Sequence, residues 1–318
     1  MTSAQRDTLS NAARDVVNLV ESGNAQILRA KMLPSIASDF AGIAATAERI
    51  KPQLRSASIT IETLDLLDAS GIPKGTASTQ FFCGSPLTIL TFGTLPPGVY
   101  ALVVLHATGV PSPQQISVIL AKSGESNWLL AGFYSKPMIQ AGHDGLWYWV
   151  SARRYVQTKM NWNAWLYYRI AADLVDPAGF ISSPNLQKLF NETDEARPPE
   201  LPVTSTLLLD SSGTPFKVTA ISTTTQFGVL DLDVSYAPDP SQVAGLRTAA
   251  SARKQVTAVM AALLALHPEL AQAFHGAWIH ANQGDSVLFA LELPMSEIRG
   301  ANVPRTTNSS PDNPDVSR

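Results

Sequence analysis

Residues 146–168 read LWYWVSARRYVQTKMNWNAWLYY and hold a third of the aromatic side chains of the chain. The pattern predicts two adjoining helices, the second running from Asn161 to Val175. Each aromatic ring buries roughly 150–250 Å² when it packs. So much ring surface in one stretch indicates either a packing centre where domains meet or a groove that holds a ligand, and the sequence leaves both interpretations open.

The periodicity of the second helix favours burial between two layers. Its apolar residues form two rows on opposite sides, Trp162, Leu166 and Ile170 on one and Ala164, Tyr168 and Ala171 on the other. In the binding interpretation, some rings line a groove for a peptide or a sugar-like ligand, and nearby cations frame its anionic end. The candidate binding residues are His143, Trp147, Trp149, Arg153, Arg154, Trp162 and Trp165, with Lys159 as a further cation.

The same stretch resembles a single tetratricopeptide repeat (TPR). The residues that carry the likeness, counted from Gly145, are Tyr148, Ala152, Tyr155, Ala164, Tyr168 and Ala171. The chain departs from the family pattern at Ala152, where the family has glycine, and at Pro177, which comes one place late. Repeats of this kind normally need about three copies to cover their apolar faces. A lone unit is therefore expected to lean on another part of the chain or on a partner, and a helix starting at Ser183-Pro184 is expected to cover one side.

Toward the N-terminus, the sequence predicts helices followed by an antiparallel sheet. Residues 3–54 have helical periodicity with a break at Glu21–Asn24, and from Ala57 the segments ASITIETLDLL, STQFFCG, LTILTFG, VYALVVLHA, ISVILAK and WLLAGFY are predicted strands. The closing stretch SGESNWLLAGFYSKP, Ser123–Pro137, resembles the last strand of NTF2-like (cystatin-related cone) domains. That resemblance implies a curved sheet wrapped around a helix over residues 3–137 and no particular activity.

Beyond the Pro-rich segment at 197–202, three predicted strands precede a long helix over 241–266 and a final hairpin at AWIHAN and SVLFALEL. The predicted fold class is α+β. It comprises an NTF2-like domain (1–139), a TPR-like hairpin with a capping helix (140–197), a small antiparallel sheet domain crossed by one long helix (198–299) and a disordered tail (300–318). The phrases GHDGLWYW, NWNAWLYY and ISSPNLQKLF make the whole chain similar to a family of uncharacterised bacterial proteins, many of them exported.

Composition excludes several classes of partner and site. A formal net charge of −3 without a long basic run argues against nucleic acid. The longest apolar run, VTAVMAALLAL at 256–266, is too short to span a bilayer. The single cysteine, Cys83, excludes an internal disulfide and a cysteine-based zinc site. The compartment stays open. The first residues predict no signal peptide, which suits a cytoplasmic location. The low charged content of 15% suits an exported protein slightly better, and the family resemblance implies a periplasmic or envelope location.

Candidate catalytic residues are few, and common catalytic motifs are missing from the sequence. His106 shares a strand face with Leu102 and Val104 and is a weak candidate for a general base in a cone cavity. The nearby acids Glu62, Asp65 and Asp68 show no spacing that pairs them with it.

The acids and histidines in the last third of the chain are not spaced like the ligands of a metal site. His275 and His280 lie five apart across a helix-to-strand junction, without a third ligand at zinc-type spacing. Asp231 and Asp233 are predicted to point to solvent from one face of a strand. We therefore expect neither a metal nor a cofactor.

The sequence favours a soluble, non-enzymatic protein that binds a partner protein or peptide through the aromatic hairpin and the adjoining cone domain. The alternative is a small-molecule enzyme or carrier that uses an NTF2-like cavity with His106. The sequence therefore allows a small-molecule ligand as well as a protein or peptide partner.

Overall fold

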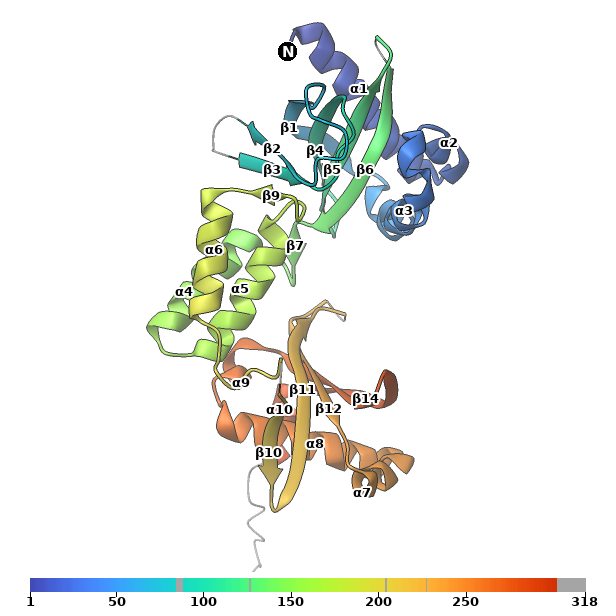
Figure 1. The fold of residues 1–318 in the computed structure, drawn as a ribbon. Coiled ribbons are helices and arrows are strands. Elements are labelled where there is room, and N and C mark those ends of the chain that lie inside the picture. The colour runs from blue at the N-terminus through green and yellow to red at the C-terminus, as the bar shows by residue number, and fades with distance from the viewer. Residues whose placement is uncertain (84–87, 126, 204, 227, 302–318) are drawn as a thin grey trace, which may run out of the picture. The chain divides into compact units, whose positions relative to one another are not determined.

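The computed structural model describes residues 1–83, 88–125, 127–203, 205–226 and 228–301. The chain is α+β, and it forms two compact units, residues 1–197 and 198–318 (Figure 1). Of the predicted disordered tail at 300–318, residues 300 and 301 belong to a helix, and residues 302–318 lie outside the described residues. No helix in the described part of the chain is both long enough and apolar enough to cross a bilayer.

The first unit begins with helices, and the first of them ends at a glycine. They are α1 (Ser3–Ser22), α2 (Ala25–Ala30), the short 3-10 helix η1 (Pro34–Asp39) and α3 (Phe40–Leu54). Thr2 and Gln5 form a capping box at the start of α1, and Gly23 ends it with a φ of 72°. Glycine reaches this left-handed conformation without a Cβ clash. The predicted break at residues 21–24 is therefore confirmed.

A four-stranded antiparallel sheet follows, in the order β1 (Ser58–Asp68), β4 (Val99–Thr108), β5 (Gln114–Ser123) and β6 (Asn127–Pro137). A smaller sheet contains β2 (Thr79–Cys83), β3 (Thr88–Phe92) and β9 (Ile181–Ser182), and a two-stranded ribbon contains β7 (Ile139–Gln140) and β8 (His143–Asp144).

The central strands β4 and β5 of the four-stranded sheet are buried on both faces. Ala101, Val103 and Leu105 of β4 pack in one apolar cluster with residues of α1, α2 and α3. Leu102 and Val104 of the same strand pack in a second cluster with residues of β2, β3 and the segment before β9. Two covered faces explain why the β4 sequence VYALVVLHA is almost continuously apolar.

The rest of the first unit is helical. It comprises α4 (Gly145–Gln157), α5 (Asn161–Val175) and α6 (Pro184–Glu195). The observed bounds of α5 match the predicted ones, and the Ser183 hydroxyl caps α6 by accepting from Leu186 N at 3.3 Å.

The second unit is a five-stranded sheet in the order β10 (Leu207–Ser211), β11 (Thr214–Thr224), β12 (Asp231–Ala237), β13 (Gly276–Gln283) and β14 (Ser286–Pro294). Its helices are α7 (Pro240–Val243), the 3-10 helix η2 (Ala244–Arg247), α8 (Ala249–Leu266), α9 (Leu270–Ala273) and α10 (Met295–Ala301).

Two expectations for this second unit are wrong. The sheet is mixed, because β12 and β13 are parallel. The helices between them carry the chain back to the end of the sheet where β12 began, so β13 runs in the same direction as β12. The predicted long helix is broken at Thr248, which is extended and caps α8 by accepting from Ser251 N at 3.3 Å.

Candidate functional site

Helix α4 is fixed at its start by a polar cap and by close packing on α5. Asp144 is the N-cap, and its Oδ1 accepts from Trp147 N at 2.8 Å. A Cβ placed on Gly145 would lie 2.5 Å from Val175 Cγ1 and 3.1 Å from Leu174 Cβ. Only glycine allows α5 to approach α4 this closely.

The substitution Gly145→Ala is expected to lower the free energy of unfolding of the first unit by about 1–3 kcal/mol, the usual cost of overpacking a tight contact. Gly179→Ala is the matched control, because a Cβ there would meet no atom within 4 Å. Urea unfolding followed by circular dichroism measures both. Equal stabilities for the two variants would show that the helices can separate at no cost.

The inner rings of the hairpin are buried against each other. Tyr148 packs edge-on against Tyr167 with ring centroids 5.2 Å apart, and Tyr155 does the same at 5.0 Å. The Tyr148 hydroxyl donates to Gln140 O at 2.9 Å, and burial raises the pKa of Tyr148 to about 12. Trp162 is only 2% exposed. The prediction that Trp162 binds a ligand is therefore wrong, because its side chain lies in the core and a ligand cannot reach it.

A second group of side chains joins α4 to α6. Glu192 Oε2 accepts from Trp149 Nε1 at 2.7 Å and from Arg153 Nε at 2.8 Å, and Oε1 accepts from Arg153 Nη2 at 2.8 Å. The Arg153 guanidinium also lies over the Trp149 ring, 4.7 Å from its centroid. Burial raises the pKa of the Glu192 carboxyl, but the hydrogen bonds from Arg153 and Trp149 outweigh it, so the pKa lies below its ordinary value.

This group changes the role of two candidate binding residues. The guanidinium of Arg153 is already occupied by Glu192, and Trp149 has its indole N–H bound there as well. Trp149 and Arg153 thus join α4 to α6 in this structure, while the Arg153 side chain stays 41% exposed.

The outer face of α4 carries the exposed apolar surface of the hairpin. Leu146 is 62% exposed, Val150 45% and Trp147 37%. Leu146, Val150 and Arg154 follow each other at intervals of four residues, so they share one face of the helix. Arg154 is exposed at the end of this row. We call these four residues the α4 face.

His143 extends this surface. Its ring stacks on Trp147 with centroids 3.6 Å apart and planes 6° from parallel, and the side chain is exposed. Trp165, another candidate, is half-buried on α5 with the Arg169 guanidinium 5.9 Å from its ring centroid. Lys159 is exposed in the turn between α4 and α5. The structure thus brings His143, Trp147 and Arg154 to one region and assigns Trp162 to the core.

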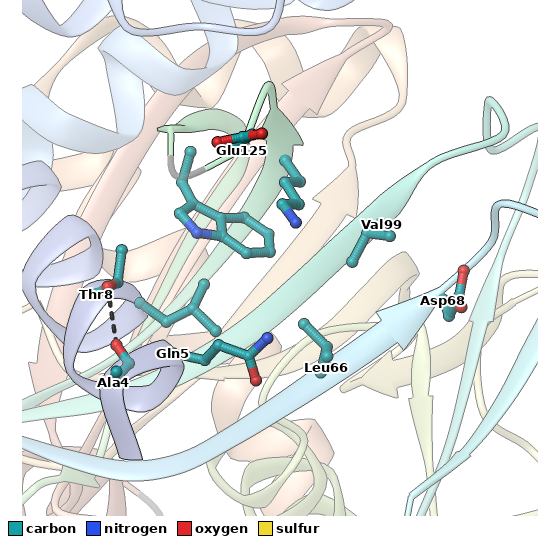
Figure 2. A pocket seen from close by; sticks show the side chains of 10 residues that line it. Ala4, Gln5, Thr8, Leu66, Asp68, Val99 and Glu125 are labelled. Carbon is teal, nitrogen blue, oxygen red and sulfur yellow. Dashed lines mark hydrogen bonds between the residues drawn. The ribbon is translucent and has the colours of Figure 1, made fainter. Parts of the chain in front are cut away.

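A cavity of about 350 Å³ lies between the start of α1 and the sheet (Figure 2). Its lining mixes charged and apolar side chains: Ala4, Gln5, Thr8, Leu9, Leu66, Asp68, Val99, Lys122, Glu125 and Trp128. The volume is at the lower end for small-molecule sites.

His106 does not line this cavity. It alternates along β4 with the residues that face the helices, and so points to the opposite face of the sheet. Its Nε2 lies 3.2 Å from Gln115 Oε1, and its Nδ1 lies 3.8 Å from Glu62 Oε2, beyond hydrogen-bond distance. Sequence spacing could not pair Glu62 with His106, because the two lie on strands more than 30 residues apart whose register, with Thr60 opposite His106, is visible only in the sheet.

In the second unit, the expectation that both acids of β12 point to solvent is wrong for Asp231. Its side chain is 1% exposed, whereas that of Asp233 is 34% exposed and pairs with His280, Oδ1 to Nε2 at 3.2 Å. His280 lies on β13, a strand that pairs with β12 on one side and β14 on the other. Among the described residues, Asp231, His275 and Glu292 could together hold a metal ion.

No protein-family model matches the chain, and neither a curated protein nor a solved structure shows significant similarity to it.

Proposed function

We propose that this chain is a non-enzymatic binding protein that captures an amphipathic segment of a partner protein on the α4 face. The observation that carries the proposal is the exposure of Leu146, Trp147 and Val150 side by side on one helix. Exposed tryptophan in a group of apolar side chains is typical of residues that dominate the energy of protein interfaces.

The surroundings of the face support this role. The Asp144 cap, the contact at Gly145 and the Glu192 group fix α4 at both ends, so the face is preorganised and little entropy is lost on binding. Arg154 places a positive charge after the apolar residues. A complementary segment carries apolar side chains on one helical face and an Asp or Glu beyond them.

We also propose that the first unit combines an NTF2-like domain with a TPR-like helical unit. Three helices covering one face of a four-stranded sheet support an NTF2-like domain over residues 1–139. Two helices in close contact through small residues, Gly145 and Ala152, support a TPR-like unit over residues 140–197. The enzyme alternative has less support, because His106 lines neither the cavity beside α1 nor the cavity of about 300 Å³ beside Tyr100 and Ile119 on its own face of the sheet.

Peptides selected from a random library against the intact chain test the proposal. We expect them to share apolar residues at helical spacing followed by an acid, and we expect Trp147→Ala to weaken their binding at least tenfold, which is about 1.4 kcal/mol. Phe190→Ala is the matched control, because this ring is 39% exposed on α6. Fluorescence anisotropy gives the affinities, and circular dichroism checks the fold.

Undiminished binding by a folded Trp147→Ala variant would contradict the proposal. If the Trp147→Ala variant instead unfolds, Trp147 is a packing residue. The peptide affinity of Val150→Ser, a variant on the same face, then decides whether the α4 face binds the partner.

A further inference from the structure

Three potential ligands meet at one end of the sheet in the second unit. Asp231 is the first residue of β12, His275 directly precedes β13, and Glu292 lies on β14. The main chain of His275 is held on two sides: its N donates to Leu230 O at 2.9 Å, and its O accepts from Met295 N at 2.9 Å. The backbone that carries the imidazole is therefore fixed relative to both neighbouring strands.

The ligand atoms are close enough for one ion to bind them all. One atom from each of the three side chains lies within 4.8 Å of the others, and His275 Nδ1 lies 3.4 Å from Asp231 Oδ1. Zinc bonds of about 2.0–2.1 Å in tetrahedral geometry place two ligand atoms about 3.4 Å apart. The half-buried Glu292 side chain can close the remaining gap by rotating about its own torsions.

The burial of Asp231 indicates that something positive is bound at this point. The side chain is 1% exposed, and Oδ1, the atom that faces His275, accepts no hydrogen bond from any described residue. A carboxylate oxygen withdrawn from water without a hydrogen bond is costly, and proteins normally place a cation or a metal beside it. The unsatisfied oxygen points into the group that contains the other two ligands.

Gly276 leaves the space for this convergence. A Cβ at this position would lie 3.0 Å from Glu292 Oε1 and 3.2 Å from Asp231 Oδ1, and 2.7 Å from the Leu293 carbonyl oxygen. Any other residue here would push against both carboxylates. The chain thus has no side chain at a backbone position that lies against both acids.

We propose that Asp231, His275 and Glu292 bind a divalent transition-metal ion of the Zn²⁺ class. One imidazole nitrogen with two carboxylate oxygens suits zinc and its first-row neighbours, whereas calcium and magnesium prefer oxygen ligands alone. The His275 side chain is 58% exposed, so the ion is open to solvent on that side. With three protein ligands, a water molecule completes a tetrahedral site.

The competing explanation is an ion pair between Asp231 and a protonated His275, with no metal. The two explanations differ in what they predict for Asp231→Asn. In the ion-pair explanation this variant removes a stabilising partner, and the chain loses stability whether or not zinc is present. In the metal explanation the variant relieves a buried charge in the metal-free protein and abolishes the stabilisation that zinc provides.

Titration calorimetry of the untagged full chain with ZnCl₂, after removal of metal with EDTA, tests the site. We expect one Zn²⁺ per chain, and at least about 100-fold weaker binding in both Asp231→Asn and His275→Ala, since the loss of even an outer-sphere partner costs 10–100-fold. His280→Ala is the matched control, because it removes a histidine paired with an aspartate on the same sheet but outside the cluster. CaCl₂ at the same concentrations should give no binding heat.

Two results would overturn the proposal. One is a wild-type chain that binds zinc no more tightly than the His275→Ala variant. The other is a loss of thermal stability in Asp231→Asn without zinc, together with no rise in the wild-type Tm when zinc is added. If Asp231→Asn does not fold, the zinc affinities of the wild type and of His275→Ala still decide, because the exposed His275 side chain can be removed without disturbing the core. This site lies in a different compact unit from the α4 face, so its test does not depend on the proposed binding function.

Discussion

Replacing Trp162 with alanine is expected to lower the free energy of unfolding of the first unit by about 3–5 kcal/mol. The side chain is 2% exposed and lies among the buried residues of α5. The substitution removes the largest fully buried side chain of that helix and leaves a cavity that the surrounding rings can fill only in part. A domain is normally stable by about 5–15 kcal/mol, so this loss removes a large fraction of the free energy of unfolding of the first unit.

Trp165→Ala is the matched control, because it removes the same side chain three residues later from a half-buried position. We expect it to cost about 1–2 kcal/mol, in proportion to the smaller area withdrawn from water. Five of the six tryptophans lie in the first unit, so tryptophan fluorescence during urea unfolding reports mainly on that unit. A Trp162→Ala cost below that of Trp165→Ala would contradict the packing described here.

Replacing Glu192 with alanine is expected to cost about 2–3 kcal/mol, because it leaves the Trp149 indole N–H and the Arg153 guanidinium without their acceptor. The loss of a fully buried pair costs about 3–5 kcal/mol, but the Arg153 side chain is 41% exposed, and water can replace part of what it loses. Glu195→Ala, which removes an exposed acid from the same helix, is the control and should be nearly neutral.

The pH dependence of this effect has a definite sign. The pKa of Glu192 is lowered in the folded protein, so its carboxylate stabilises the fold above the unfolded-state value of about 4.3. The contribution is then lost as the pH falls through the lower folded pKa. The stability difference between wild type and Glu192→Gln should accordingly be constant from pH 7 to about 5 and shrink below about 4.3. A difference that grows on acidification would contradict the assignment.

Local signals in the sequence were sufficient to predict most of the secondary structure. The capping residues Asp144 and Ser183 and the turn at Gly23 each fix a helix end through atoms within four residues of the cap. The strands of the first sheet were recognisable from β-branched and aromatic residues between glycine and proline turns. These signals depend on neighbouring residues alone, so a single sequence contains them.

The candidate site was harder to predict, because its decisive contacts join distant residues. Glu192 meets Arg153 across 39 positions, and no local pattern distinguishes it from the exposed Glu195 three residues later. The alternation along β12 correctly placed Asp231 and Asp233 on one face. It could not show that Gly276 and the neighbouring chain cover that face at Asp231.

The two covered faces of the first sheet also determine which part of the unit is the last to unfold locally and expose its amides to solvent. Strands β4 and β5 have hydrogen-bonded neighbours on both edges as well as apolar layers above and below. Solvent can reach their amides only after an outer layer and an edge strand have detached. Their deuterium uptake should therefore be the slowest in the unit and should track its global unfolding, whereas the outer helices can exchange through partial opening.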